Sequence, residues 1–256
     1  MKTWLIRITS LLFTLSVFYG FALAGEENQL RDAAAQYWDA RAKCDWQKLY
    51  NFLSPAEKKK KTAEQFASSM TERNAFTFVS WKVVDQKIEG NLGWVEMENV
   101  LQSKDYEDMP PTKAHFWQVW RNFGDSWCVL PKEDNMDAPR LPPHMRNTAE
   151  EASLSKRIAE TWEAKEKGDW AKAYDALSPD FHQKMPLDQF MKMTALNQYL
   201  GHQTEWVEAI GNQGRAKTTC LMKSNDPSLA KMDSAQTTMI EKWILIDGQW
   251  YLDVKN

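Results

Sequence analysis

The chain has 256 residues, with 43% hydrophobic and 26% charged side chains and a formal net charge of −3 at pH 7. This balance is that of ordinary globular proteins, and the length suits two domains. It argues against a nucleic-acid partner, because phosphate binding requires a basic stripe. The one long basic run, residues 58–61, is interpreted as a solvated helix face.

Residues 1–24 have the pattern of a secretory signal peptide. Lys2 and Arg7 give a positive start, residues 11–21 are apolar and uncharged, and residues 22–24 (Ala-Leu-Ala) form a small-x-small cleavage site. The alternative is an uncleaved anchor helix, but the apolar run is short for a span of about 20 residues. We therefore expect a soluble, exported protein, periplasmic or secreted, with no transmembrane segment after cleavage.

The mature chain is predicted to begin with helices and to continue with strands. Apolar residues at helical spacing between Leu30 and Ala42 indicate an amphipathic helix. Ser54 before Pro55 is a typical helix start, and the segment from Thr62 to Gln65 has the capping-box pattern. The apolar period then changes to two, which predicts strands over residues 76–84, 94–101, 116–120 and 127–130.

A linker is predicted over residues 131–148, where four prolines stand among charged residues without periodicity. The same order of elements then recurs, starting with a helix through Leu154, Ile158 and Trp162. Strands are predicted over residues 206–210, 216–222, 237–246 and 250–254.

The second half of the chain repeats residues of the first half at a nearly constant offset. Trp38, Lys43, Asp45, Trp46, Tyr50, Leu53, Ser54 and Pro55 recur as Trp162, Lys167, Asp169, Trp170, Tyr174, Leu177, Ser178 and Pro179, and Trp120 and Trp127 recur as Trp243 and Trp250. The repeat predicts two domains of one fold, residues 25–130 and 149–256, joined by the linker. Helices followed by an antiparallel meander make each domain α+β.

The pattern W-x-A-x-x-x-G-D-W-x-x-A-Y-x-x-L-S-P over residues 162–179, and W-x-x-x-x-G-x-W over residues 243–250, resemble the NTF2-like superfamily. The resemblance extends over most of both copies, and it implies two tandem cone domains, each a curved antiparallel sheet wrapped around a long helix. The helical hairpin also mimics a tetratricopeptide unit. However, such units recur every 34 residues, and here strands intervene.

Neither a metal site nor a cofactor site is predicted. The three mature cysteines, Cys44, Cys128 and Cys220, are widely spaced and have no CxxC pattern. Cys44 and Cys128 could form a disulfide in an oxidising compartment, whereas buried free thiols in strands are the alternative. No phosphate-binding loop, nucleophile elbow or calcium loop is present. None of the four histidines has a sequence neighbour that places a carboxylate beside it.

The candidate ligand-binding residues all lie in the strands of the first copy, where unrepeated tryptophans accompany two acids. They are Trp81, Trp94, Glu96, Glu98, Trp117 and Gln118. Aromatic walls with one or two carboxylates suit a small apolar or cationic ligand. The alternative places Glu96 and Glu98 on a solvent-facing strand face.

No catalytic residue is assigned from the sequence. The prediction is a non-catalytic module that binds a ligand or another exported protein. One alternative is an enzyme with an isomerase-, cyclase- or hydrolase-like active cone and one degenerate copy, since the resemblance includes such enzymes. A purely structural role is the other alternative. Asymmetry between the two domains should discriminate, because an enzyme needs one polar interior.

Overall fold

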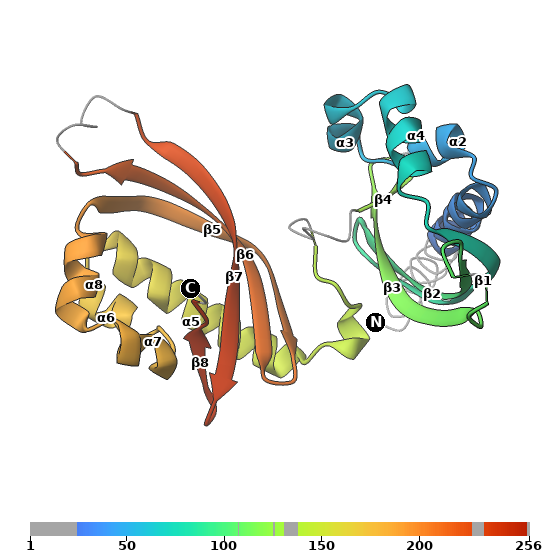
Figure 1. Ribbon diagram of the computed structural model, residues 1–256. Coiled ribbons are helices and arrows are strands. Elements are labelled where there is room, and N and C mark those ends of the chain that lie inside the picture. Colours follow the sequence, from blue (N-terminus) through green and yellow to red (C-terminus); the bar gives the residue numbers. More distant parts are fainter. Residues whose placement is uncertain (1–24, 107, 125, 131–137, 227–232, 255–256) are drawn as a thin grey trace, which may run out of the picture. The chain divides into compact units, whose positions relative to one another are not determined.

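The computed structural model describes residues 25–106, 108–124, 126–130, 138–226 and 233–254. The predicted signal peptide and residues 131–137 of the predicted linker lie outside these ranges. The chain divides into two compact units, residues 1–133 and 134–256, each of which is described by itself (Figure 1). Among the described residues, no helix is both long and apolar enough to cross a bilayer.

The first unit places its helices before a four-stranded antiparallel sheet. Residues 25–42 are helical. The elements that follow are α2 (Trp46–Tyr50), α3 (Pro55–Lys60), α4 (Ala63–Glu72), β1 (Phe76–Glu89), β2 (Leu92–Ser103), β3 (Thr112–Asn122) and β4 (Trp127–Val129). The strands pair in the order β1-β2-β3-β4, as a meander.

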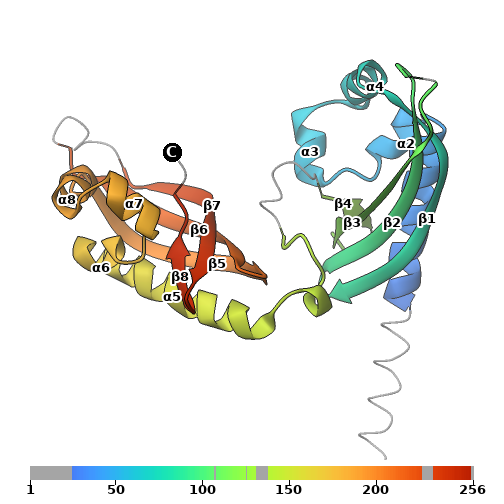
Figure 2. The same ribbon diagram turned by 60° about the horizontal axis from the view of Figure 1, so that its bottom comes forward.

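The second unit has the same order of elements. These are the 3₁₀ helix η1 (Pro143–Met145), α5 (Thr148–Glu166), α6 (Trp170–Tyr174), α7 (Pro179–Lys184), α8 (Leu187–Thr194), β5 (Asn197–Ile210), β6 (Gln213–Ser224), β7 (Ala235–Ile246) and β8 (Gln249–Leu252). Its sheet has the order β5-β6-β7-β8 and curves along α5 (Figure 2). The predicted α+β class, with helices packed on antiparallel sheets, is confirmed.

Capping explains where the short helices begin. The Ser54 hydroxyl accepts a hydrogen bond from the backbone N–H of Glu57, with Pro55 at the first helical position. Thr62 and Gln65 form both bonds of a capping box, which confirms that prediction. Each cap satisfies a backbone N–H that the helix itself leaves free, so local sequence fixes these boundaries.

The two sheets are equivalent down to their irregularities. In β1 the pairing with β2 shifts after Phe78 and after Val83, and in β5 it shifts after Tyr199 and after Thr204. The strands run further than their apolar alternation indicated, above all β5, which starts at Asn197 and was predicted to start at residue 206. Polar residues such as His202 occupy interior positions there and break the alternation.

Each core forms where the long helix meets one face of the sheet. In the first unit Leu30, Ala34 and Trp38 pack against the sheet, and in the second unit Leu154, Ile158 and Trp162 do so. In each unit, the long helix lies close against one glycine of the sheet. A Cβ at Gly214 would lie 2.5 Å from Leu154 Cδ2, and one at Gly93 would lie 2.6 Å from Leu30 Cδ2.

Candidate functional site

The interior of the second unit contains a buried carboxylate. Glu241 of β7 is 5% exposed. Its Oε2 accepts hydrogen bonds from Trp162 Nε1 at 3.1 Å and from the Thr218 hydroxyl at 2.9 Å. Its Oε1 is equally buried and has no hydrogen-bond partner. An oxygen of this kind is costly to bury, because it has lost water without gaining a replacement.

Lys165 of α5 provides the positive charge nearest to this carboxylate. Its Nζ lies 3.8 Å from Glu241 Oε1, too far for a hydrogen bond, and 3.9 Å from the centre of the Trp162 ring. Trp162 and Lys165 are three residues apart, so they share one face of the helix. Burial lowers the pKa of Lys165, and the charge of Glu241 opposes that shift. The two groups therefore form a buried ion pair without a direct hydrogen bond.

A thiol and a phenol adjoin the pair. Cys220 of β6 is 1% exposed, and burial raises its pKa although Lys165 acts against that shift. Burial also raises the pKa of Tyr199, whose ring packs edge-on against Trp162 at 5.4 Å between centroids. Both groups thus keep their protons at neutral pH and offer neutral donors, not nucleophiles.

A histidine and an acid lie beside Trp162 at a less buried position. The His202 ring stacks on Trp162, with 5.6 Å between centroids and 16° between planes. Its Nδ1 lies 2.7 Å from Glu166 Oε1, and the side chains are 18% and 28% exposed. Sequence spacing did not indicate a carboxylate beside His202, because Glu166 belongs to α5 and His202 to β5.

We call this group the Trp162 cluster. It consists of Trp162, Lys165, Glu166, Tyr199, His202, Thr218, Cys220 and Glu241. The Lys165–Glu241 pair can donate to and accept from one polar group, or exchange a proton with it. Among the described residues, no group of three or more His, Cys, Asp or Glu side chains could hold a metal ion.

In the first unit, the position that corresponds to Glu241 holds Gln118, a neutral hydrogen-bond acceptor. Trp38 Nε1 donates to Gln118 Oε1 at 3.0 Å, as Trp162 donates to Glu241. Phe78 and Phe116 pack on the Trp38 ring, at 5.7 and 5.8 Å between centroids. Arg41, the counterpart of Lys165, lies over Phe78 at 5.7 Å. This interior thus has aromatic rings and an amide where the second unit has a carboxylate.

Strand pairing also decides which residues correspond. Trp81 pairs with Asn99, and His202 pairs with Cys220 at the same ladder position. His202 therefore corresponds to Trp81. The spacing that relates Trp38 to Trp162 would instead match His202 with Phe78, but it does not hold in the sheet, because the segment between helix and sheet is three residues shorter in the second copy.

Comparison with known proteins gives no family. No protein-family model matches the chain, and no curated protein matches it. Among solved structures, a SEC-C motif-containing protein from Rhodopseudomonas palustris is 12% identical with a TM-score of 0.35, covering 40% of this chain and 77% of that one. A SEC-C motif-containing protein from Psychrobacter arcticus is 15% identical with a TM-score of 0.31, covering 43% and 64%.

An NTF2-like protein involved in plasmid conjugation is similar over a longer stretch. It is 11% identical with a TM-score of 0.28, and the match covers 82% of this chain and 90% of that one. None of the three likenesses assigns the chain to a family or gives it a function.

The residues predicted to bind a ligand lie on both faces of the first sheet. Trp81 packs against the core, and Gln118 bonds to Trp38 inside the unit. Trp94, Glu96 and Glu98 alternate with the core residues Val95 and Met97, and Trp117 is paired with Glu96. These four therefore share the other face, where Trp94 is fully buried and Trp117 half-buried.

Glu96 and Glu98 have basic side chains as partners on that face. Glu98 lies 2.8 Å from Lys113 Nζ and 3.0 Å from Lys82 Nζ, and their hydrogen bonds lower its pKa. Glu96 Oε1 lies 3.5 Å from His115 Nε2. The side chains of Glu96 and Glu98 are each 19% exposed, so this face is only partly open to solvent. Ligand binding by these residues stays a prediction.

The cysteines are free thiols. Cys44 is exposed, and Cys128 and Cys220 are buried. This arrangement agrees with the free-thiol alternative and not with a Cys44–Cys128 disulfide. Sequence reasoning did not select Cys220 or Glu241. The one signal available was that Glu241 breaks the apolar alternation between Met239 and Trp243 in the second copy.

Proposed function

We propose that the chain is an exported protein of two NTF2-like domains, in which the second unit binds a small ligand through the Trp162 cluster. The first unit then acts as a structural or protein-interaction domain. The internal repeat and the helix-then-meander order of both units support the shared fold. The charge and apolar pattern of residues 1–24 support export to the periplasm or beyond.

The observation that carries the proposal is the exchange of Gln118 for Glu241 at one position of a shared fold. Each unit gives the indole N–H of its long helix an acceptor, and in the first unit that acceptor is a neutral amide. A carboxylate there costs more to bury. Buried charge that the fold does not require is typical of functional sites.

The chemical class of the ligand follows from the hydrogen bonds that Lys165 and Glu241 can still form. Glu241 Oε1 needs a hydrogen-bond donor, and Lys165 Nζ can donate. A neutral hydroxyl meets both needs with one atom. An anion would be repelled by Glu241, and a cation would be repelled by Lys165. A neutral hydroxylated small molecule is thus the preferred ligand class.

The test uses the mature chain, residues 25–256, and a panel of neutral polyols and phenols, carboxylic acids and amines. Thermal unfolding and tryptophan fluorescence report binding. We expect saturable changes with hydroxylated compounds, lost in Glu241→Gln and kept in Glu205→Gln, an acid that pairs with Lys217 on the same sheet at 2.8 Å. Binding that persists in Glu241→Gln, or no binding by any class, would refute the proposal.

A second candidate function is catalysis, favoured by the 3.8 Å approach of the carboxylate to the ammonium. Such a pair can move a proton within a bound molecule. An enzyme would convert a bound compound to product, and Glu241→Gln would abolish conversion. Recovery of every bound compound unchanged after long incubation would leave only the binding function.

A further inference from the structure

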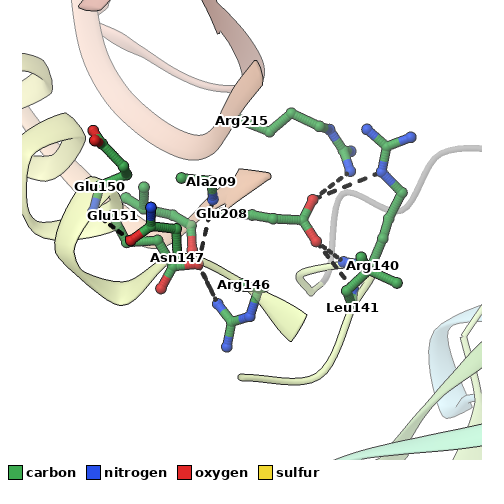
Figure 3. A network of polar contacts seen from close by, with 10 residues as sticks. Arg140, Leu141, Arg146, Asn147, Glu150, Glu151, Glu208, Ala209 and Arg215 are labelled. Atoms are coloured by element: carbon green, nitrogen blue, oxygen red, sulfur yellow. Dashed lines mark hydrogen bonds and ion pairs between the residues drawn. The ribbon is translucent and has the colours of Figure 1, made fainter. Parts of the chain in front are cut away.

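The second unit contains two buried acids that differ in how fully their oxygens are bound. Glu208 of β5 is 2% exposed. Its Oε1 accepts hydrogen bonds from the backbone N–H groups of Arg140 at 2.7 Å and Leu141 at 3.0 Å (Figure 3). Its Oε2 lies 3.4 Å from Arg215 Nη1 and 3.7 Å from Arg140 Nε. Both oxygens of Glu208 are therefore engaged, as a buried acid with a structural role requires.

Glu241, on the core face of the same sheet, keeps one oxygen available. Trp162 and Thr218 donate to its Oε2, whereas Oε1 has no hydrogen-bond partner among the described residues. The ammonium of Lys165 faces Oε1 at 3.8 Å, and its side chain is 15% exposed. The carboxylate and the amine thus face each other without a hydrogen bond that a third group would have to break.

Lys165 becomes a nucleophile once it loses a proton. Burial destabilises an ammonium, and it lowers the pKa of Lys165. Glu241 Oε1 can take that proton, since it faces the ammonium and no donor occupies it. The transfer leaves a neutral amine beside a neutral acid and so removes two charges from the core. Desolvated lysines are the ones that proteins use to form imines with carbonyl compounds.

The first unit has neither half of this pair. Arg41 stands in place of Lys165, and a guanidinium stays protonated in proteins, so it is no nucleophile. Gln118 stands in place of Glu241, and an amide does not carry protons in this way. The two copies share one fold, so the fold does not require the pair. Its nucleophile and its proton carrier are present together in one copy and absent together in the other.

We infer that Lys165 forms an imine with a neutral hydroxylated aldehyde or ketone, and that Glu241 carries the protons. The inference rests on the proposed function, because the Trp162 cluster must first admit such a molecule. A carbonyl bond is about 1.2 Å long. Attack on its carbon starts from roughly 3–3.5 Å, and a proton reaches its oxygen over roughly 2.6–3.2 Å. One carbonyl group can therefore contact both Nζ and Oε1, which are 3.8 Å apart.

The reaction conserves protons and charge. Lys165 gives one proton to Glu241, and its lone pair forms the C–N bond while the π electrons of the carbonyl move to oxygen. Glu241 protonates that oxygen and takes a second proton from the nitrogen, which gives a carbinolamine. The nitrogen lone pair then forms the C=N bond as the C–O bond breaks, and Glu241 returns its proton so that water leaves. The product is an iminium beside a carboxylate, so one ion pair replaces another.

The experiment traps the imine in the mature chain, residues 25–256. The probes are 4-hydroxybenzaldehyde and glycolaldehyde, and 4-hydroxybenzyl alcohol and ethylene glycol are the matched alcohols without a carbonyl. Sodium borohydride reduces an imine to a stable secondary amine, which intact mass and peptide mapping locate. We expect an adduct at Lys165 that is at least about tenfold more abundant than at any exposed lysine, because a bound carbonyl is held beside the amine.

Two variants of neighbouring lysines sharpen the test. Lys165→Arg copies the first unit and keeps the positive charge, and it should lose the adduct. Lys167→Arg is the control, since Lys167 lies at the end of the same helix and pairs on the surface with Glu163 at 3.4 Å. This variant should keep the adduct. Circular dichroism checks the fold of both, and the peptide map of the wild type gives the result even if Lys165→Arg does not fold.

Fluorescence titration with the two alcohols separates this inference from the proposed function. No adduct at Lys165 with either aldehyde, or adducts spread evenly over the exposed lysines, would overturn the inference. Saturable binding of the alcohols in that case would leave the proposed function standing, whereas no binding would count against both. An adduct at Lys165 without binding of the alcohols would support the imine and refute the preference for hydroxyl groups.

Discussion

The two units have the same strand order, the same β-bulges and the same glycine beneath the long helix, yet their interiors differ in charge. The first surrounds Trp38 with aromatic rings and a neutral amide. The second surrounds Trp162 with a carboxylate, an ammonium and a thiol. Residues that define the fold are therefore separable from those that define the chemistry. The difference identifies the second interior as the place to test for function.

The largest expected effect comes from breaking the buried pair. Lys165→Met leaves the Glu241 carboxylate buried without its cation and should cost about 3–5 kcal/mol of the free energy of unfolding of the second unit. Urea titration followed by circular dichroism measures it. The double variant Lys165→Met/Glu241→Gln copies the amide of the first unit and should recover most of the loss. A double variant no more stable than the single one would show that the two interiors are not interchangeable.

Each unit has a glycine in its sheet that lies against the long helix, so replacing this glycine should destabilise both units equally. Gly93→Ala and Gly214→Ala each push a Cβ into a leucine of the long helix, so each should destabilise its unit by about 1–3 kcal/mol. Gly201→Ala is the control, because no atom lies within 4 Å of its added Cβ. Differential scanning calorimetry resolves the effect. A loss in one unit only would mean that the helices are not equally close to their sheets.

The indole acceptor in the first unit can be removed separately. Gln118→Leu leaves Trp38 Nε1 buried without a partner and should cost about 1–3 kcal/mol. Gln118→Glu retains an acceptor and tests whether the first interior accepts the charge of the second. Urea titration of both variants provides the measurement. Gln118→Leu as stable as wild type would mean that this hydrogen bond contributes nothing.

The smallest effect is a dependence on alkaline pH. Burial raises the pKa of Cys220, so the unfolded chain releases this proton first, at an ordinary thiol pKa of about 8.5. The stability that the group contributes is complete below that pH and declines above it, by at most about 1.4 kcal/mol per pH unit. Cys220→Ala should reduce the decline between pH 7 and 9.5. Thiol labelling of folded protein at pH 8 should modify Cys44 rapidly and Cys220 slowly; equal rates would contradict this.

Several features of the fold followed from local sequence. The caps at Ser54 and Thr62, the α+β order and the meander were predictable, because they depend on residues a few positions apart and on a change of period from helical to two. The early part of β5 was not predictable. Its interior position at His202 is polar, so alternation does not indicate a strand there.

The sequence by itself determined that one pattern of helices, turns and strands occurs twice, since caps, glycines and repeated tryptophans act locally. Only the tertiary structure decided which side chains meet. Glu241 reaches Trp162 across 79 positions, and Glu208 reaches the backbone of Arg140 and Leu141 across 68 and 67. Such contacts depend on which face of a strand meets the helix, and a one-residue change of register reverses every face. Strand pairing and packing therefore decide that Glu241 lies in the interior of the second unit. They also decide that Glu96 and Glu98 lie on the face of the first sheet opposite its core.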